Sequence, residues 1–415
     1  MNTKLTVLIL AGGSSSRFFP FNTGNHKTGL TLHGRSIISH TITGLVNKGF
    51  TNLVVVLNSA DTADSDSNLK SRITTEFPEV DITFIEQPEA KGMGDAVLAA
   101  KAKLPAFFAV CFPNTTEAGA LLTQMVEKTD TCCVLAQKTD KPELYGILEI
   151  ENDLAVGIVE KPAPEAAPSE YKVSGLYVLN QDFLEILTGL AGAEYNFETA
   201  LNTLMEKTPV AISYSDATLP SYKYPWHLFD VQELFFSQLK SYRADNAKVA
   251  VTSIIDELKG PVYLADGVII GDSCKIIGPC YIGQDVFIGD FSLIRHSSIE
   301  SGAKIGAYSE VARSIVMENT TLHYSYLGDS IIGRDVQIGA GLITANKRLD
   351  RATVKVEVKG ERVDTQRPGQ GVMIGPKAKL GIRVNTMPGI CIGSHSTVFP
   401  AQTITKNVEH HAVIK

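Results

Sequence analysis

The stretch Ile270–Ile299, which reads IGDSCKIIGPCYIGQDVFIGDFSLIRHSSI, carries an isoleucine at every sixth position from Ile270 to Ile294. A period of six is too long for the alternation of a strand and does not fit the turn of a helix. It is the period of a parallel β-helix, in which each short strand contributes one inward aliphatic side chain and small residues occupy the corners. The stretch therefore predicts a solenoid of hexapeptide repeats.

The same spacing persists over most of the C-terminal half. It shifts by one residue at Ile299 and again before Ile332, and it resumes after a break at Ile374. The other aliphatic residues that keep the spacing are Ile305, Val311, Met317, Ile338, Leu380, Ile392, Val398 and Ile404. A chance run of aliphatic residues would not hold one register over so many repeats, so residues 251–415 are predicted to form the solenoid.

The first half has a different pattern, because residues 4 to about 230 alternate apolar runs with amphipathic segments. The predicted strands are Leu5–Leu10, Leu53–Leu57, Ile82–Ile85 and Ala106–Cys111, and the predicted helices are Ile37–Lys48, Gly94–Leu104 and Glu117–Lys128. This alternation predicts an α/β domain with a mostly parallel sheet, whose ligands bind beyond the carboxyl ends of the strands. Residues 231–250 are predicted to form a linker helix, and the polar segment Asp61–Ser67 a solvated loop.

Composition narrows the class of protein. The chain has 415 residues, enough for two or three domains, and its formal charge of -7 argues against binding of nucleic acid or of a membrane surface. Small anionic ligands remain compatible with this charge, since they need only a local positive pocket. The six cysteines form no C-x-x-C pair, which indicates neither a zinc site nor a disulfide framework, and reduced thiols in the cytoplasm are the simpler interpretation.

The first predicted strand runs into Ala11, Gly12 and Gly13, followed by Arg17 and later by Lys27. Glycines allow backbone N–H groups to approach a base or a phosphate, and the two cations could neutralise a triphosphate. The turn is neither a G-x-G-x-x-G fingerprint nor a G-x-x-x-x-G-K-[ST] loop. Taken alone, a Gly-Gly turn after a strand is often only a turn.

This opening resembles the signature of the sugar-1-phosphate nucleotidylyltransferases, and three further segments match that family in the same order. They are Gln87–Ala96 (QPEAKGMGDA), Tyr145–Gly146 with Ile158–Pro162 (IVEKP), and Trp226–Val231 (WHLFDV). The resemblance implies roles for the matching residues. A catalytic role falls on Arg17; nucleotide contacts fall on Ala11, Gly12, Gly13, Lys27, Gln87 and Gly92; sugar-phosphate contacts fall on Gly146, Glu160 and Lys161.

The family transfers a nucleotidyl group to a sugar phosphate, and Mg²⁺ normally neutralises the charge that develops on the phosphate. The resemblance places Asp230 at one of two metal positions. Asn114 stands at the other, where the family has Asp, and Val173–Gly175 replaces an Asn-Ala-Gly-like turn. A neutral amide lacks the charge of a carboxylate, so we expect a weakened Mg²⁺ site and a nucleotidyl transfer that is slow, altered in substrate, or lost.

Two segments interrupt the solenoid pattern, Leu322–Asp329 (LHYSYLGD) and Gly339–Lys347 (GAGLITANK), and the second leads into an excursion that ends near Gly371. Seven Lys or Arg against four acids make residues 347–371 basic, which suits a phosphate contact. The alternative is a solvated hairpin whose charge has no ligand.

The two segments resemble the acetyltransferase half of bifunctional glucosamine-1-phosphate acetyltransferase/N-acetylglucosamine-1-phosphate uridylyltransferases. The resemblance implies that His323 is the catalytic base, that Arg295 and Tyr326 contact the sugar phosphate, and that Ala340 and Asn346 meet acetyl-CoA. Imidazole suits the task, because the amine must be deprotonated as it attacks the thioester. A lone His at a coil corner is otherwise usually a surface residue. Departures from the family are Ala312, where a substrate Lys is usual and Arg313 lies beside it, and Gln337, which replaces an Asn.

The expected fold class is α/β, with a Rossmann-like nucleotidyltransferase domain over residues 1–230 followed by a left-handed parallel β-helix over residues 251–415. The expected function is synthesis of an amino-sugar nucleotide of the UDP-N-acetylglucosamine kind, and acetyl transfer is the firmer expectation because Asn114 departs from the metal position that nucleotidyl transfer needs. The expected ligands are acetyl-CoA, a nucleoside triphosphate and a sugar phosphate, and the resemblance implies a homotrimer. The alternatives are a non-catalytic sugar-nucleotide-binding or regulatory homologue, and a solenoid that acylates another amino sugar or none.

Overall fold

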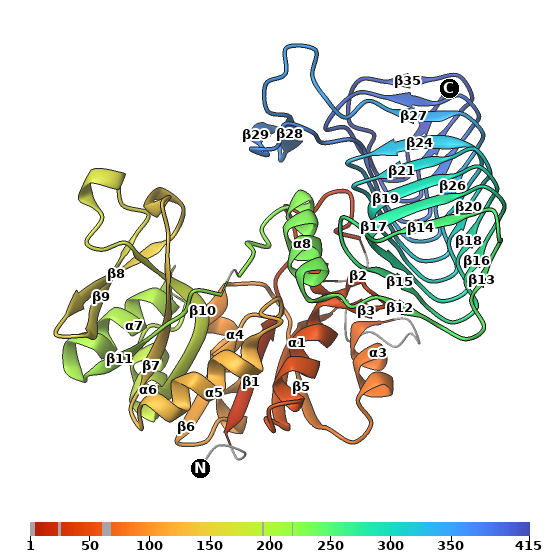
Figure 1. Cartoon of the computed structure of the whole chain (residues 1–415). Coiled ribbons are helices and arrows are strands. Elements are labelled where there is room, and N and C mark those ends of the chain that lie inside the picture. The colour runs from red at the N-terminus through yellow and green to blue at the C-terminus, as the bar shows by residue number, and fades with distance from the viewer. Residues whose placement is uncertain (1–4, 24–25, 60–67, 193–194, 218) are drawn as a thin grey trace. The chain divides into compact units, whose positions relative to one another are not determined.

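The computed structural model describes residues 5–23, 26–59, 68–192, 195–217 and 219–415 (Figure 1). The expected loop Asp61–Ser67 lies outside these residues. The chain forms two compact units: the first comprises Met1–Ser14, Gly24–Leu30 and Ser36–Leu219, and the second comprises Ser15–Thr23, Thr31–Arg35 and Pro220–Lys415. Among the described helices, none combines the length and apolarity needed to cross a membrane.

The first unit contains a nine-stranded sheet in the order β5-β4-β1-β6-β10-β7-β11-β9-β8. Its strands are β1 (Thr6–Ala11), β4 (Asn52–Asn58), β5 (Asp81–Gln87), β6 (Phe107–Cys111), β7 (Cys133–Lys138), β8 (Gly146–Glu151), β9 (Leu154–Glu160), β10 (Tyr171–Asn180) and β11 (Val210–Tyr214). The four predicted strands are confirmed as β1, β4, β5 and β6, and they run parallel. The sheet as a whole is mixed, because β10 is antiparallel to both β6 and β7.

Helices cover both faces of this sheet. They are α1 (Ile37–Val46), α3 (Leu69–Glu76), α4 (Met93–Ala100), α5 (Ala118–Lys128), α6 (Gln181–Gly189) and α7 (Asn196–Lys207). Successive side chains of a strand point to opposite faces, so Leu8 of β1 packs in the core with α4, α6 and α7, while Val7 and Ile9 pack with α1 and α5. Burial on both faces explains why these strands read as continuous apolar runs.

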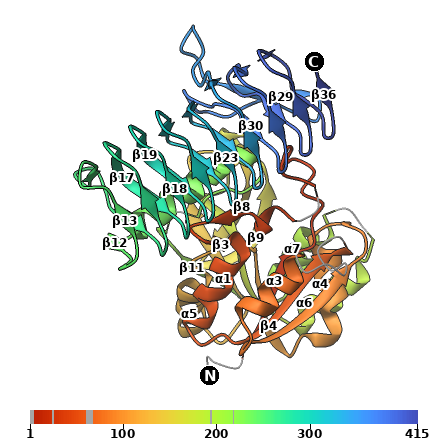
Figure 2. The same cartoon turned by 90° about the vertical axis from the view of Figure 1, so that its right-hand side faces the viewer.

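The second unit is a coiled stack of short parallel strands. One nine-stranded sheet runs β13 (Lys248–Val249), β16 (Ile269–Ile270), β18 (Phe287–Ile288), β20 (Lys304–Ile305), β23 (Thr321–Leu322), β26 (Gln337–Ile338), β31 (Lys379–Leu380), β34 (Thr397–Val398) and β36 (Val413–Ile414). Figure 2 shows this row of strands from β13 to β36, each one coil further along the chain.

The other strands of the stack form a fourteen-stranded parallel sheet. They are β12 (Tyr242–Arg243), β14 (Ile254–Asp256), β15 (Val262–Leu264), β17 (Lys275–Ile282), β19 (Leu293–Ile299), β21 (Glu310–Ala312), β22 (Ile315–Val316), β24 (Ser325–Gly328), β25 (Ile331–Ile332), β27 (Leu342–Thr344), β30 (Met373–Ile374), β32 (Asn385–Thr386), β33 (Cys391–Ile392) and β35 (Thr403–Ile404).

The interior of the stack is a column of aliphatic side chains in register. Ile270 pairs with Ile288, Ile288 with Ile305, and Ile305 with Leu322, and all four are buried. The coil from Ile288 to Ile305 is one residue shorter than the coil from Ile270 to Ile288. This difference in coil length is the physical reason for the shift in the repeat at Ile299.

Residues 231–250 differ from the expected linker helix. The helix α8 covers only Leu228–Gln238, and β12 and β13 already pair with the coils that follow. Leu239 has extended backbone angles, and the small side chains of Ala244 and Ala247 are buried in the core of the stack. The stack therefore begins before residue 251.

Two segments of the first half belong to the second unit. The backbone N–H groups of His33 and Gly34, at the turn between β2 (Thr31–Leu32) and β3 (Arg35–Ser36), each donate to Glu300 at 2.8 Å. Burial and the nearby Glu318 raise the pKa of the Glu300 carboxyl to about 8, and the two N–H groups oppose that shift. Residues 20–23 also contact the last coils, where the Ser394 hydroxyl donates to the carbonyl of Pro20 at 3.0 Å.

Ile270→Ala should destabilise the stack by about 2 to 5 kcal/mol, because it leaves a cavity in a close-packed column. Ile269 is the adjacent residue of the same strand and is 43% exposed, whereas Ile270 is 2% exposed. Ile269→Ala is therefore the matched control and should cost less than about 1 kcal/mol. Chemical denaturation measures both, and equal losses would contradict the inward assignment of Ile270.

Candidate functional site

The glycine turn of the first unit lies against the side chain of Gln87. Gly12 and Gly13 follow the end of β1, and a Cβ on Gly12 would collide with the amide oxygen of Gln87. Gln87 is buried, and its Nε2 donates to the carbonyl of Gly92 at 3.3 Å and to Asp95 Oδ2 at 2.9 Å. The structure thus brings together three residues that the sequence assigned to the nucleotide.

Lys27, at the start of a short 3-10 helix (Lys27–Gly29), follows a buried histidine. Nδ1 of His26 accepts the N–H of Thr28 at 3.3 Å, and Nε2 lies 3.5 Å from the position of a Cβ on Gly13. Burial, and to a smaller extent the charge of Lys27, lower the pKa of His26 to about 3. The His26 ring is therefore neutral and packs beneath the glycine turn.

The sugar-phosphate residues of the first unit meet at the start of β8 and the end of β9. Gly146 pairs with Glu160, and a Cβ on Gly146 would lie 3.0 Å from Glu160 Oε2. Lys161 Nζ lies 3.4 Å from Glu160 Oε1. A further acid, Glu198, was not predicted from the sequence. Burial and the neighbouring Glu160 raise the pKa of its carboxyl, and Lys161 lowers it. Both charged residues of the motif are exposed and available to a ligand.

The residues implied for Mg²⁺ fit the ion poorly. Asn114 contributes only a neutral amide, and Asp230 Oδ1 of α8 lies 3.2 Å from Nη1 of Arg367, whose guanidinium stacks 4.7 Å from the ring centroid of Phe229. No cluster of three or more His, Cys, Asp or Glu side chains suitable for a metal occurs within the described ranges.

The predicted catalytic residue Arg17 belongs to the second unit and is exposed, with its guanidinium carbon 5.9 Å from the ring centroid of Tyr224.

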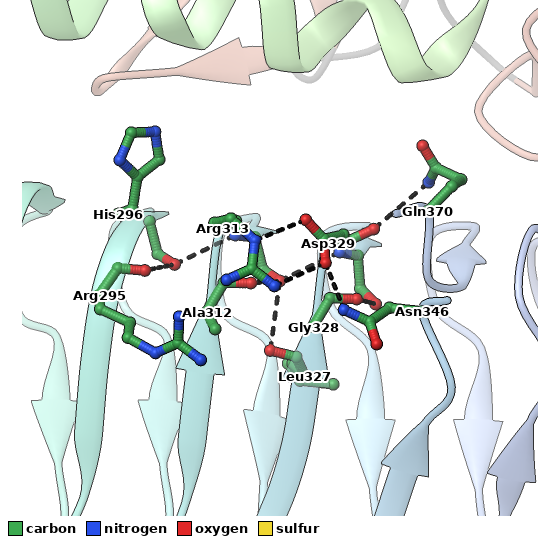
Figure 3. A network of polar contacts seen from close by, with 12 residues as sticks. Arg295, His296, Ala312, Arg313, Leu327, Gly328, Asp329, Asn346 and Gln370 are labelled. Atoms are coloured by element: carbon green, nitrogen blue, oxygen red, sulfur yellow. Dashed lines mark hydrogen bonds and ion pairs between the residues drawn. The ribbon is translucent and has the colours of Figure 1, made fainter. Parts of the chain in front are cut away.

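A network of polar contacts lies along one edge of the stack (Figure 3). Arg295 of β19, Ala312 of β21 and Gly328 of β24 are register partners on successive coils. Nε and Nη2 of Arg295 donate to Glu310 Oε1 at 3.1 and 2.6 Å. The predicted phosphate arginine is thus ion-paired with a half-buried acid on the next coil.

The centre of this network is Asp329, which the sequence reading did not single out. Arg313 donates from Nε and Nη2 to the two carboxylate oxygens at 2.7 Å each, and Asn346 Nδ2 also donates to Oδ2. A Cβ on Gly328 would lie 2.8 Å from the Tyr326 hydroxyl and 2.9 Å from Asn346 Nδ2. Two predicted site residues, Tyr326 and Asn346, therefore converge over Gly328.

His323 lies at a different corner of the stack, immediately after β23. Its side chain is exposed, and it lines a cavity of about 750 Å³ together with Gly339, Lys304 and Lys379. Its backbone N–H donates to the carbonyl of Ile338 at 3.2 Å, and that of Gly341 donates to the carbonyl of Tyr324 at 2.8 Å. His323 is therefore accessible to a ligand, and Ala340, which is predicted to meet acetyl-CoA, lies at the same corner one coil further along.

The excursion of the second unit contains an antiparallel hairpin, β28 (Lys355–Val358) and β29 (Glu361–Asp364). Two of its basic residues are ion-paired, Arg348 with Asp350 and Arg367 with Asp230. The pairing reduces the positive charge that the composition suggested. It does not remove the exposed Lys355, Lys359 and Arg362.

Known proteins resemble the chain over its whole length. A family described as nucleotidyl transferase matches residues 6–218, and a domain described as the GMPPB C-terminal domain matches residues 258–363. The bifunctional sugar-1-phosphate nucleotidylyltransferase/acetyltransferase of Sulfurisphaera tokodaii is 30% identical over 426 residues, covering 99% of this chain and 100% of that protein. The bifunctional protein GlmU of Methanocaldococcus jannaschii is 29% identical over 423 residues, covering 99% and 97%.

His26 should make the protein less stable as the pH falls. A histidine whose pKa is about 3 when folded and 6.5 when unfolded binds protons mainly in the unfolded state, so its stabilising contribution is complete above pH 6.5 and is lost below it. Between pH 7 and pH 5 the loss should be about 2 kcal/mol. His26→Gln should flatten this dependence, as measured by thermal unfolding. An unchanged pH dependence in the variant would contradict the assignment of a buried neutral ring.

Proposed function

The chain belongs to the family of bifunctional sugar-1-phosphate nucleotidylyltransferases/acetyltransferases, and we propose that it makes an amino-sugar nucleotide of the UDP-N-acetylglucosamine kind. It is a transferase. The non-catalytic alternative is not favoured, because relatives named as bifunctional enzymes match both halves of the chain.

The acetyl-transfer half rests on one observation above all: the exposed ring of His323 lines a cavity on the outer surface of the stack. In the proposed reaction the amine of a sugar phosphate attacks the carbonyl carbon of acetyl-CoA, a C–N bond forms and the C–S bond breaks. His323 takes the proton of the amine, and the thiolate of CoA leaves and is protonated to the thiol. The proposed sugar-phosphate contacts are Arg295 and Tyr326, and the proposed acetyl-CoA contacts are Ala340 and Asn346.

The nucleotidyl-transfer half is supported by the convergence of Gly12, Gln87 and Gly92. The glycine turn would bind the nucleoside triphosphate through its backbone, and Lys27 and Arg17 would supply positive charge. Gly146, Glu160 and Lys161 would hold the sugar phosphate, whose oxygen attacks the α-phosphorus while pyrophosphate leaves. Because Asn114 and the paired Asp230 fit a cation poorly, this half is proposed to be the slower one.

We also propose that the coils wind left-handed, that the protein is a homotrimer and that it is cytoplasmic. The stack exposes several large apolar side chains on its outer surface, which suits packing between copies. They include Phe287, Phe291, Tyr308, Ile343 and Phe399.

A paired assay of the purified protein tests the two halves separately. We expect thiol release from acetyl-CoA with an amino-sugar phosphate, and slower pyrophosphate release from a nucleoside triphosphate with a sugar phosphate and Mg²⁺. Absence of thiol release with every amino-sugar phosphate tried would overturn the acetyl-transfer proposal.

His323→Ala should lower the rate of acetyl transfer by about two to four orders of magnitude, the usual contribution of a general base. His395→Ala is the control, because the His395 side chain is likewise exposed, lies between two strands of the stack (β33 and β34) and has no proposed role. Rates of thiol release at saturating substrates compare the two variants. If His323→Ala turned over at the unmodified rate at neutral pH, the ring would not be the base.

Asn114→Asp should raise nucleotidyl transfer at a fixed Mg²⁺ concentration, because it adds the negative charge that a hard cation prefers. Asn152→Asp, in the turn between β8 and β9, makes the same chemical change away from the site and should leave the rate unchanged. Pyrophosphate release across a Mg²⁺ titration provides the measurement. Superimposable titrations of Asn114→Asp and the unmodified chain would contradict the proposal that Asn114 weakens the cation site.

A further inference from the structure

Asp329 is a buried acid that accepts hydrogen bonds at both its carboxylate and its backbone carbonyl. It is 5% exposed, and its carboxylate accepts hydrogen bonds from Nε and Nη2 of Arg313 and from the side-chain amide of Asn346. Its backbone carbonyl accepts the N–H of Gly371 at 2.7 Å and Nε2 of Gln370 at 3.4 Å. A buried carboxylate needs such partners to be stable in its charged form.

The contact with Asn346 fixes the direction of its side-chain amide. A carboxylate can only accept hydrogen bonds, so Nδ2 of Asn346 must face Asp329, and the amide oxygen must face away from it. The backbone of Asn346 is held as well, because its carbonyl accepts the N–H of Gln370 at 2.8 Å. Asn346 therefore has one orientation to offer to a ligand, and Asp329 selects it.

The contact with Arg313 fixes the surroundings of Tyr326. Asp329 chiefly raises the pKa of the Arg313 guanidinium, and the neighbouring Tyr326 hydroxyl raises it further. Asp329 uses Nε and Nη2 of the guanidinium, so Arg313 is held in one orientation beside Tyr326.

Asp329 also joins the two ends of the excursion. Asn346 stands where the chain leaves the coils, and residues 370 and 371 stand where it returns. Asp329 thus contacts the beginning and the end of the excursion, whose strands β28 and β29 form a separate two-stranded sheet. Loss of these contacts should disturb Asn346 and the excursion together.

We propose that Asp329 is a positioning residue for acetyl transfer, which orients Asn346 directly and Tyr326 through Arg313. The inference rests on the proposed function of the solenoid. Asp329 itself touches neither substrate, and it acts only by holding Tyr326, the proposed sugar-phosphate contact, and Asn346, the proposed acetyl-CoA contact.

Two substitutions test the role. Asp329→Asn keeps the shape but leaves one acceptor oxygen for three donors, and Asp329→Glu keeps the charge but moves it outward by one methylene. Both should lower kcat for acetyl transfer by about 100-fold, the effect of misplacing groups by about 1 Å. The KM for acetyl-CoA should change by less than about threefold, since the backbone of Ala340 is a second proposed donor contact that these substitutions leave in place. Asp335→Asn, at a corner acid whose contact is with Asn319, is the control and should behave as the unmodified chain.

The outcomes separate this inference from the proposed function. Folding of each variant is checked by its thermal midpoint, and Asp329→Glu decides the question if Asp329→Asn does not fold. A folded Asp329 variant with the unmodified kcat overturns the positioning role, and so does a loss confined to KM. Failure of the unmodified chain to transfer acetyl overturns the proposed function itself.

Discussion

The structure of the second unit depends on one constraint: each short parallel strand must place one aliphatic side chain inside the coil, in register with the coils on either side. Ile270, Ile288 and Ile305 meet this constraint on successive coils. An unsatisfied polar side chain in an apolar interior is costly, yet the hydroxyls of Ser325 and Thr386 are buried without a hydrogen-bond partner among the described residues. The charged groups are found at corners and outer faces, where His323 is exposed, or in pairs such as Asp329 with Arg313.

Much of the fold could be predicted because its periods are simple. The six-residue spacing predicted the stack, and apolar runs predicted β1, β4, β5 and β6. The prediction over residues 231–250 was less accurate, because small residues such as Ala244 and Ala247 suit a helix as well as the interior of a coil, and tertiary packing decided between them. The direction of β10 could not be read from the sequence either, since antiparallel and parallel strands buried on both faces have the same composition.

The site could be predicted only as far as residue type carries its chemistry. His323, Tyr326 and Asn346 stand out because they interrupt a pattern of aliphatic and small residues. Their arrangement depends on pairings between distant segments, such as Asp329 with residues 370 and 371, and Asp230 with Arg367. Such contacts are set by where the excursion rejoins the coils, and no local pattern records that position. The inclusion of Ser15–Thr23 in the second unit was missed for the same reason.

The proposed acetyl transfer requires the outer surface of the coil stack to present an imidazole to an amine beside a thioester. A crystal structure of the protein with coenzyme A and an amino-sugar phosphate would show whether it does. The sulfur of coenzyme A is expected beside the ring of His323 and the backbone of Ala340. Coenzyme A bound away from the coils, or a ring of His323 that faces no ligand while both substrates are ordered, would contradict the proposal.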